Sequence, residues 1–180
     1  TSASFVEKNM LVINNTWEHY QSDLSEKSRL EGSLLASIGY DGMIHDYKNY
    51  LIRQDEKYYE HVVAHLGAAN AILDKYKTLD LTAAETVAIS NIKAVFKSYW
   101  KGLHKAKVMI TKKANITDIE KAIIINDKPA IRGLESLRKG VILKQRNGNI
   151  LSKSRILADL RASLGYNGMI HNFKNYVLRH

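Results

Sequence analysis

Apolar residues recur every three or four positions along most of the chain, which is the pattern of amphipathic helices. The clearest stripes span residues 58–76, 92–110 and 131–142. Pro129 is the single proline, and the alternating apolar and polar residues typical of β-strands are missing. Because amphipathic helices are stable only when their apolar faces pack together, the sequence predicts an all-α, antiparallel helical bundle.

Several helix boundaries are visible in the sequence. Capping boxes, in which a threonine hydroxyl accepts an orphan amide and a glutamate reaches back, are predicted at Thr82–Glu85 and Thr117–Glu120. Asp127 followed by Pro129 predicts another helix start, because proline in the first turn has no amide to leave unsatisfied. Residues 147–149, Asn-Gly-Asn, predict a break before a final helix from about residue 150.

The N-terminal part of the chain has no glycine or proline before Gly32. Residues 5–53 are therefore expected to form one long leading helix, kinked at Gly39 and Gly42.

The chain contains an internal repeat. Residues 28–53 (SRLEGSLLASIGYDGMIHDYKNYLIR) align without gaps on residues 154–179 (SRILADLRASLGYNGMIHNFKNYVLR), and more than half of the positions are identical. This organisation predicts a single helical domain over residues 1–180, made of a leading helix (1–27), a first module (28–146) and a repeat of the motif helix (150–180).

The repeated motif separates into two faces when it is drawn as a helix. A polar, basic stripe, identical in the two copies, holds His45, Lys48, Asn49 and Arg53 in the first and His171, Lys174, Asn175 and Arg179 in the second. The opposite face is apolar and aromatic, with Met43, Tyr47, Tyr50 and Leu51 in the first copy and Met169, Phe173, Tyr176 and Val177 in the second. A face that is merely solvated tolerates exchanges such as lysine for arginine, so the identity of the stripes indicates a shared role. The alternative is a recent duplication in which the stripes have not yet drifted, although other positions of the repeat have changed.

Two roles fit the stripes. If the two motif helices run parallel, their stripes lie side by side. They then offer several hydrogen-bond donors, including an arginine guanidinium that binds in a bidentate manner, to a small carboxylate- or phosphate-type anion. All eight stripe residues are then ligand-binding residues. Alternatively, the stripes hydrogen-bond to neighbouring helices and fix the register of the bundle without any ligand.

Composition and charge narrow the function classes. Of 180 residues, 45% are apolar and none is cysteine, which describes a globular domain without disulfides, thiolate zinc sites or cysteine nucleophiles. No nucleophile elbow, P-loop, dinucleotide fingerprint or zincin motif is present, so we expect neither an enzyme nor a cofactor. The net charge is +9, of which +7 lies in the last 42 residues. This asymmetry favours either an anionic partner or a solvated basic face.

Metal binding is a further alternative. His61 and His65 have the i, i+4 spacing that holds a metal on one helix face, but His65 falls in an apolar stripe, which favours a core histidine. His45 and His171 are a second candidate pair, for a metal or haem iron.

The motif Gly-Tyr-x-Gly-Met-Ile-His-x-Phe/Tyr-Lys-Asn-Tyr-x-x-Arg resembles the signature of an all-helical extracytoplasmic sensor region of bacterial transmembrane receptors, chiefly methyl-accepting chemotaxis proteins. Residues 119–130 resemble the end of that module, and Trp17 with Tyr20 resembles its start. Asp41 and Asn167 depart from the pattern, which has glycine there.

The resemblance implies the periplasmic portion of a bacterial inner-membrane protein, with membrane segments outside these residues. It implies a homodimeric receptor that binds a small-molecule ligand and signals through helix displacement, and it supplies no ligand identity. The alternatives from the residues themselves are a soluble basic helical protein that binds nucleic acid, or a histidine-based metal or haem protein. No helix-turn-helix or zinc-finger pattern supports nucleic-acid binding, so we expect no nucleic-acid partner.

Overall fold

The computed structural model describes residues 26–39, 41–145, 160, 163–164 and 168–179. These residues form helices and no strand, so the predicted all-α bundle is confirmed for the described part of the chain. The helices are α2 (Glu26–Ile38), α3 (Met43–Arg53), α4 (Glu56–Lys77), α5 (Ala83–Thr111), α6 (Ile116–Ala122), α7 (Lys128–Gln145) and α9 (Met169–Arg179).

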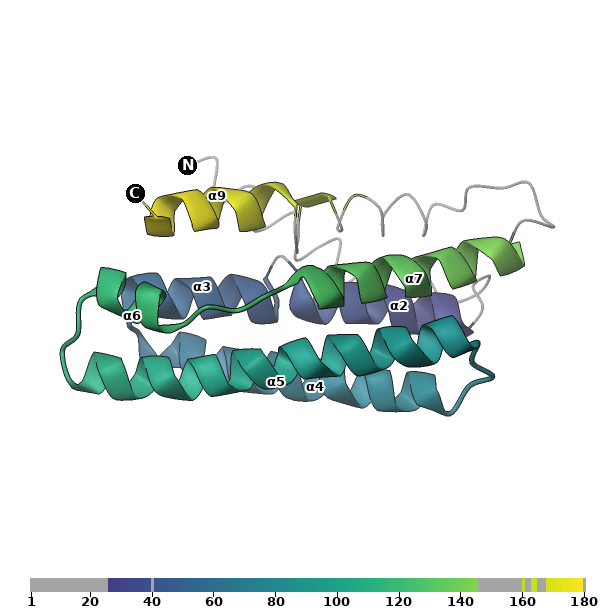
Figure 1. Ribbon diagram of the computed structural model, residues 1–180, viewed down its shortest axis with the longest axis horizontal. Helices are drawn as coiled ribbons and strands as arrows, with labels where there is room; N and C mark the ends of the chain where they lie inside the picture. Colours follow the sequence, from purple (N-terminus) through teal and green to yellow (C-terminus); the bar gives the residue numbers. More distant parts are fainter. Residues whose placement is uncertain (1–25, 40, 146–159, 161–162, 165–167, 180) are drawn as a thin grey trace.

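The helices are stacked in layers (Figure 1). Helices α2 and α3 follow one another in one row, and the long antiparallel pair α4 and α5 covers one side of that row. Helix α7 runs back along α5, while α9 lies on the other side of α3 from α4. The core lies where the apolar stripes meet, and its fully buried side chains include Leu34, Leu73, Ile92, Leu103 and Leu137.

The expected long leading helix is broken within its described part. Helix α2 ends at Ile38 and α3 begins at Met43, so a turn replaces the predicted kink. Asp41 has a φ of 58°, in the left-handed region that glycine favours and aspartate tolerates. A Cβ on Gly42 would lie 2.6–2.7 Å from two carbonyl oxygens of α2, so only glycine fits there. Residues 5–25 of the expected helix lie outside the described part, as does Asn167.

The capping signals have mixed outcomes. Thr82 and Glu85 form the predicted capping box, with the Glu85 amide 3.2 Å from Thr82 Oγ1 and the Thr82 amide 2.8 Å from Glu85 Oε2. The box predicted at Thr117–Glu120 is wrong, because Asn115 caps this helix two residues earlier and accepts the Asp118 amide at 2.9 Å. Pro129 lies in the first turn of α7, as predicted. The break at 147–149 lies outside the described residues.

Candidate functional site

Helices α3 and α9, which carry the two copies of the motif, lie side by side and run in the same direction (Figure 1). The Lys174 ammonium of α9 donates a hydrogen bond to Asn49 Oδ1 of α3 at 2.7 Å. Lys48 of α3 donates in turn to Asn175 Oδ1 of α9. The lysine of each copy thus bonds to the asparagine of the other, and we call these four residues the lysine–asparagine ladder. The predicted meeting of the stripes in parallel helices is confirmed for these residues.

His45 lies beside the ladder. Lys174 Nζ is 3.2 Å from Nδ1 and 3.3 Å from Nε2 of His45, and the ring nitrogen without a hydrogen can accept a bond from the ammonium. Burial, reinforced by the charge of Lys174, lowers the pKa of His45 from its ordinary 6.5 to about 4, although Asp46 works in the opposite direction. His45 is therefore neutral at pH 7, and Lys174 provides the positive charge at this contact.

This lowered pKa predicts a pH dependence of stability. Between pH 6.5 and about 4 the unfolded chain binds a proton at His45 and the folded chain does not, so acidification favours unfolding. Because solvent partly screens this group, we expect the free energy of unfolding to fall by about 1 kcal/mol between pH 7 and pH 5. Urea titrations at the two pH values should show that His45→Gln removes this part of the loss. His104→Gln, which changes an exposed histidine, is the matched control, and an equal effect of both variants would contradict the assignment to His45.

The other stripe residues are not all brought into the same contact. The Arg53 Nη1 donates to the Tyr58 hydroxyl at 2.9 Å, and the guanidinium lies over the Tyr58 ring, 5.5 Å from its centroid. Arg53 therefore faces α4 instead of the ladder. The side chains of His171 and Arg179 lie outside the described part of the structure, so their predicted role stays a prediction.

Asp46 contacts both histidines of the proposed metal pair. Its Oδ2 lies 3.6 Å from His61 Nδ1 and 3.4 Å from His65 Nε2. Asp46 is buried, His65 half-buried and His61 exposed, so the three side chains tie α3 to α4. Among the described residues, no group of three histidine or acidic residues is arranged to hold a metal ion.

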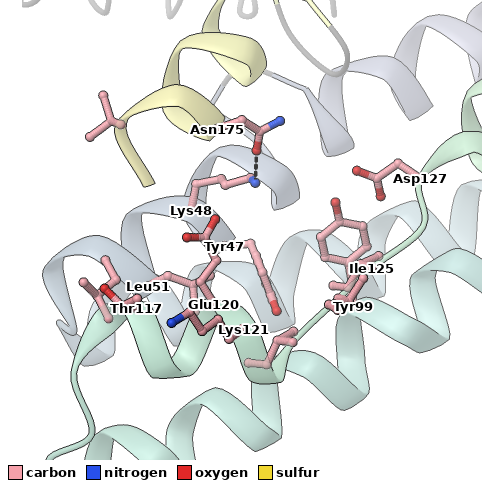
Figure 2. A pocket seen from close by; sticks show the side chains of 14 residues that line it. Tyr47, Lys48, Leu51, Tyr99, Thr117, Glu120, Lys121, Ile125, Asp127 and Asn175 are labelled. Carbon is pink, nitrogen blue, oxygen red and sulfur yellow. Dashed lines mark hydrogen bonds between the residues drawn. The ribbon is translucent and has the colours of Figure 1, made fainter. Parts of the chain in front are cut away.

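A cavity of about 570 Å³ lies directly beneath the ladder, between α3, α6, α9 and the segment that leads into α7. Figure 2 shows Lys48 and Asn175 meeting above it. Its apolar lining residues are Leu51, Ile116, Ile123, Ile124, Ile125 and Val177, together with the rings of Tyr47 and Tyr99. Its polar lining residues are Lys48, Thr117, Glu120, Lys121, Asp127 and Asn175. A mixed lining with a few polar groups is typical of small-molecule sites.

Tyr47, a lining residue of this cavity, also carries a buried polar atom. Its side chain is only 3% exposed, and its hydroxyl has no hydrogen-bond partner among the described residues. The ring packs edge-on against Tyr99, 5.0 Å between centroids. Burial, aided by the nearby Asp127 carboxylate, raises the pKa of Tyr47, so the hydroxyl keeps its proton and can donate a hydrogen bond.

Three of these features were not predicted from the sequence: the role of Asp46, the role of the Tyr47 hydroxyl, and the cavity. The available signal for the first two was that both residues change in the second copy, to Asn172 and Phe173, while the stripe does not change. The position of the cavity could not be found from the sequence, because its lining comes from segments up to 130 residues apart, from Tyr47 to Val177.

Comparison of the chain with protein-family models, with curated proteins and with solved structures finds no match. The resemblance of the motif to receptor sensor regions therefore stays a prediction. None of the described helices is long and apolar enough to cross a membrane.

Proposed function

We propose that this chain is the ligand-sensing module of a bacterial transmembrane receptor, with its ligand site in the cavity beneath the ladder. The observation that supports the proposal is a convergence: the cavity is lined by the first motif copy, the second copy and the segment around residues 119–127. These segments carry most of the resemblance to the sensor region of chemotaxis receptors, and Trp17 and Tyr20, which resemble its start, lie outside the described residues. Under this proposal the module lies in the periplasm, and a methyl-accepting chemotaxis protein is the favoured receptor class.

We assign a small organic acid as the ligand, in a lining where two lysines stand beside two acidic residues, Glu120 and Asp127. Lys48 and Lys121 are cationic groups for a carboxylate, and the isoleucine side chains around residues 123–125 contact an apolar body. The Tyr47 hydroxyl is a donor for a further polar group of the ligand, which would satisfy a buried atom that has no partner among the described residues.

The ladder gives the site a route to a signal. Lys48 belongs both to the cavity wall and to the contact with α9. A carboxylate that draws the Lys48 ammonium into the cavity moves it away from Asn175 and so weakens the attachment of α9 to α3. A hydrogen bond to a charged group contributes about 1.5–3 kcal/mol, which is enough to change a two-state equilibrium about ten- to hundred-fold. In this mechanism the ligand shifts α9 between two packings.

A thermal-shift screen with small organic acids tests the ligand site. We expect at least one acid to raise the melting temperature of the wild-type protein and to lose that effect in Lys48→Met. Lys93→Met, which removes a lysine paired with Asp74 away from the cavity, is the matched control and should retain the shift. Arg53→Ala should also retain it, because Arg53 faces α4. The absence of a shift with every acid, or its loss in Arg53→Ala but not in Lys48→Met, would contradict the cavity as the site.

A further inference from the structure

The two copies of the motif bury their apolar faces to very different extents. In α3, Met43, Tyr47, Tyr50 and Leu51 are 0–4% exposed. Their counterparts in α9 are 46–63% exposed, namely Met169, Phe173, Tyr176 and Val177. The spacing of these four residues places them on one side of the helix. The second copy therefore presents, as a continuous surface, the same face that the first copy buries in the core.

The ladder explains why this face points outward. Both copies use the polar stripe for the contact between α3 and α9, through Lys48 with Asn175 and Lys174 with Asn49. The apolar faces lie opposite the stripes, so they point away from the shared contact in opposite directions. That of α3 points into the bundle and that of α9 points out of it, except at its edge, where Val177 also lines the cavity. The apolar face of α9 is thus exposed because the two repeated stripes contact each other. Its residues have not been replaced by polar ones.

The first copy shows which kind of surface covers this face. Tyr47 packs edge-on against Tyr99 of α5, and Tyr50 packs against Tyr59 of α4 at 5.6 Å between centroids. The Tyr47 hydroxyl points at Gly102, where an added Cβ would lie only 2.6 Å away. The cover of α3 is therefore an antiparallel helix pair with one aromatic ring on each helix and a small residue opposite the Tyr47 hydroxyl.

Two residue changes in the second copy narrow the chemistry expected of the surface that covers α9. Phe173 replaces Tyr47 and lacks the hydroxyl, a change that favours burial and removes the need for a glycine opposite the ring tip. Asn172 replaces Asp46, whose carboxylate lies 3.4–3.6 Å from two histidines of α4. A neutral amide at this position requires no histidine pair on the partner.

We propose that the face of α9 formed by Met169, Phe173, Tyr176 and Val177 docks an antiparallel helix pair whose facing surface is of the α4–α5 kind, so that α9 serves a second bundle as α3 serves the first. The described bundle of a second copy does not offer that surface, because its own α3 already covers it. This inference does not depend on the ligand site.

A fusion chain tests the proposal with a defined partner. In it, residues 54–145 are repeated directly after Arg179, which reproduces the junction between Arg53 and Gln54. We expect hydrogen exchange of the α9 amides to slow by about ten-fold or more relative to the original chain, because the added helices cover the face. Phe173→Glu should abolish this protection in the fusion while leaving the melting temperature of the original chain unchanged.

The matched control is Val87→Glu, which introduces the same charge at a 59% exposed apolar residue of α5. It should leave the α9 protection in the fusion intact. The proposal is overturned if the α9 amides exchange equally fast with and without the added helices. It is also overturned if the original chain self-associates with increasing concentration and Phe173→Glu abolishes that association, since the face then belongs to a second copy. Neither measurement involves a ligand, so its outcome is distinguishable from failure of the cavity.

Discussion

Replacement of Lys27 by methionine is expected to lower the free energy of unfolding by about 3–5 kcal/mol, a large share of the stability of a small domain. Lys27 Nζ lies 2.8 Å and 2.7 Å from the two carboxylate oxygens of Glu85, and both residues are buried. Methionine fills a similar volume but removes the ammonium, which leaves the Glu85 carboxylate charged inside the bundle. The cost is the desolvation of that unpaired charge and not the loss of packing.

The pH dependence of this pair has a definite sign. Burial acts to raise the pKa of Glu85, but hydrogen bonds from Lys27 and Thr82 outweigh burial, so the pKa is held below its ordinary value. A lowered carboxyl pKa adds stability above the ordinary pKa of about 4, and that stability is lost as the pH falls through the lowered value. Urea titrations across this pH range should show that the free energy of unfolding falls less steeply with decreasing pH in Lys27→Met than in the wild type.

Two further variants separate charge burial from packing. Lys27→Met combined with Glu85→Gln should recover most of the lost stability, because glutamine carries no charge and still caps α5 through Thr82. Lys93→Met breaks the solvent-exposed pair with Asp74 and should cost no more than about 1 kcal/mol. If Lys27→Met and Lys93→Met cost the same, or if Glu85→Gln gives no recovery, the buried pair does not have the assigned role.

The helices were predictable because helical periodicity is a local property. The stripe at 58–76 corresponds to α4 (Glu56–Lys77), and the capping box at Thr82–Glu85 begins α5. The break between α2 and α3 was underestimated, because it depends on the approach of Gly42 to carbonyl groups of the preceding turn. The Lys27–Glu85 pair was not predicted, since its partners are 58 residues apart and meet only after the helices pack.

The candidate site was also predictable only in part. The repeat placed Lys48, Asn49, Lys174 and Asn175 on matching stripes, and these residues meet in the ladder. The direction of Arg53 was not predictable, because the Tyr58 hydroxyl that accepts from it lies on the next helix. A helical projection assigns a residue to a face, but the neighbour that the face meets is set by tertiary packing.

Replacement of Tyr47 by phenylalanine is expected to stabilise the protein without ligand by about 1 kcal/mol, because it removes a buried hydroxyl with no hydrogen-bond partner among the described residues. Gly102→Ala should have the opposite effect and cost about 2 kcal/mol. The new Cβ would lie 2.6 Å from the Tyr47 hydroxyl and 2.9 Å from Cγ2 of Ile123, and the ring cannot move easily because it packs against Tyr99. Chemical denaturation of each variant measures both effects.

The double variant tests whether the two residues act through one contact. Tyr47→Phe should recover about half of the cost of Gly102→Ala, since the contact with Ile123 remains, and a purely additive result would contradict the clash. Gly67→Ala is the matched control, because no atom lies within 4 Å of an added Cβ there. If the hydroxyl serves the proposed ligand, Tyr47→Phe should also reduce the thermal shift produced by the acid that stabilises the wild type. Higher stability without ligand together with a smaller ligand shift would separate a binding role for Tyr47 from a structural one.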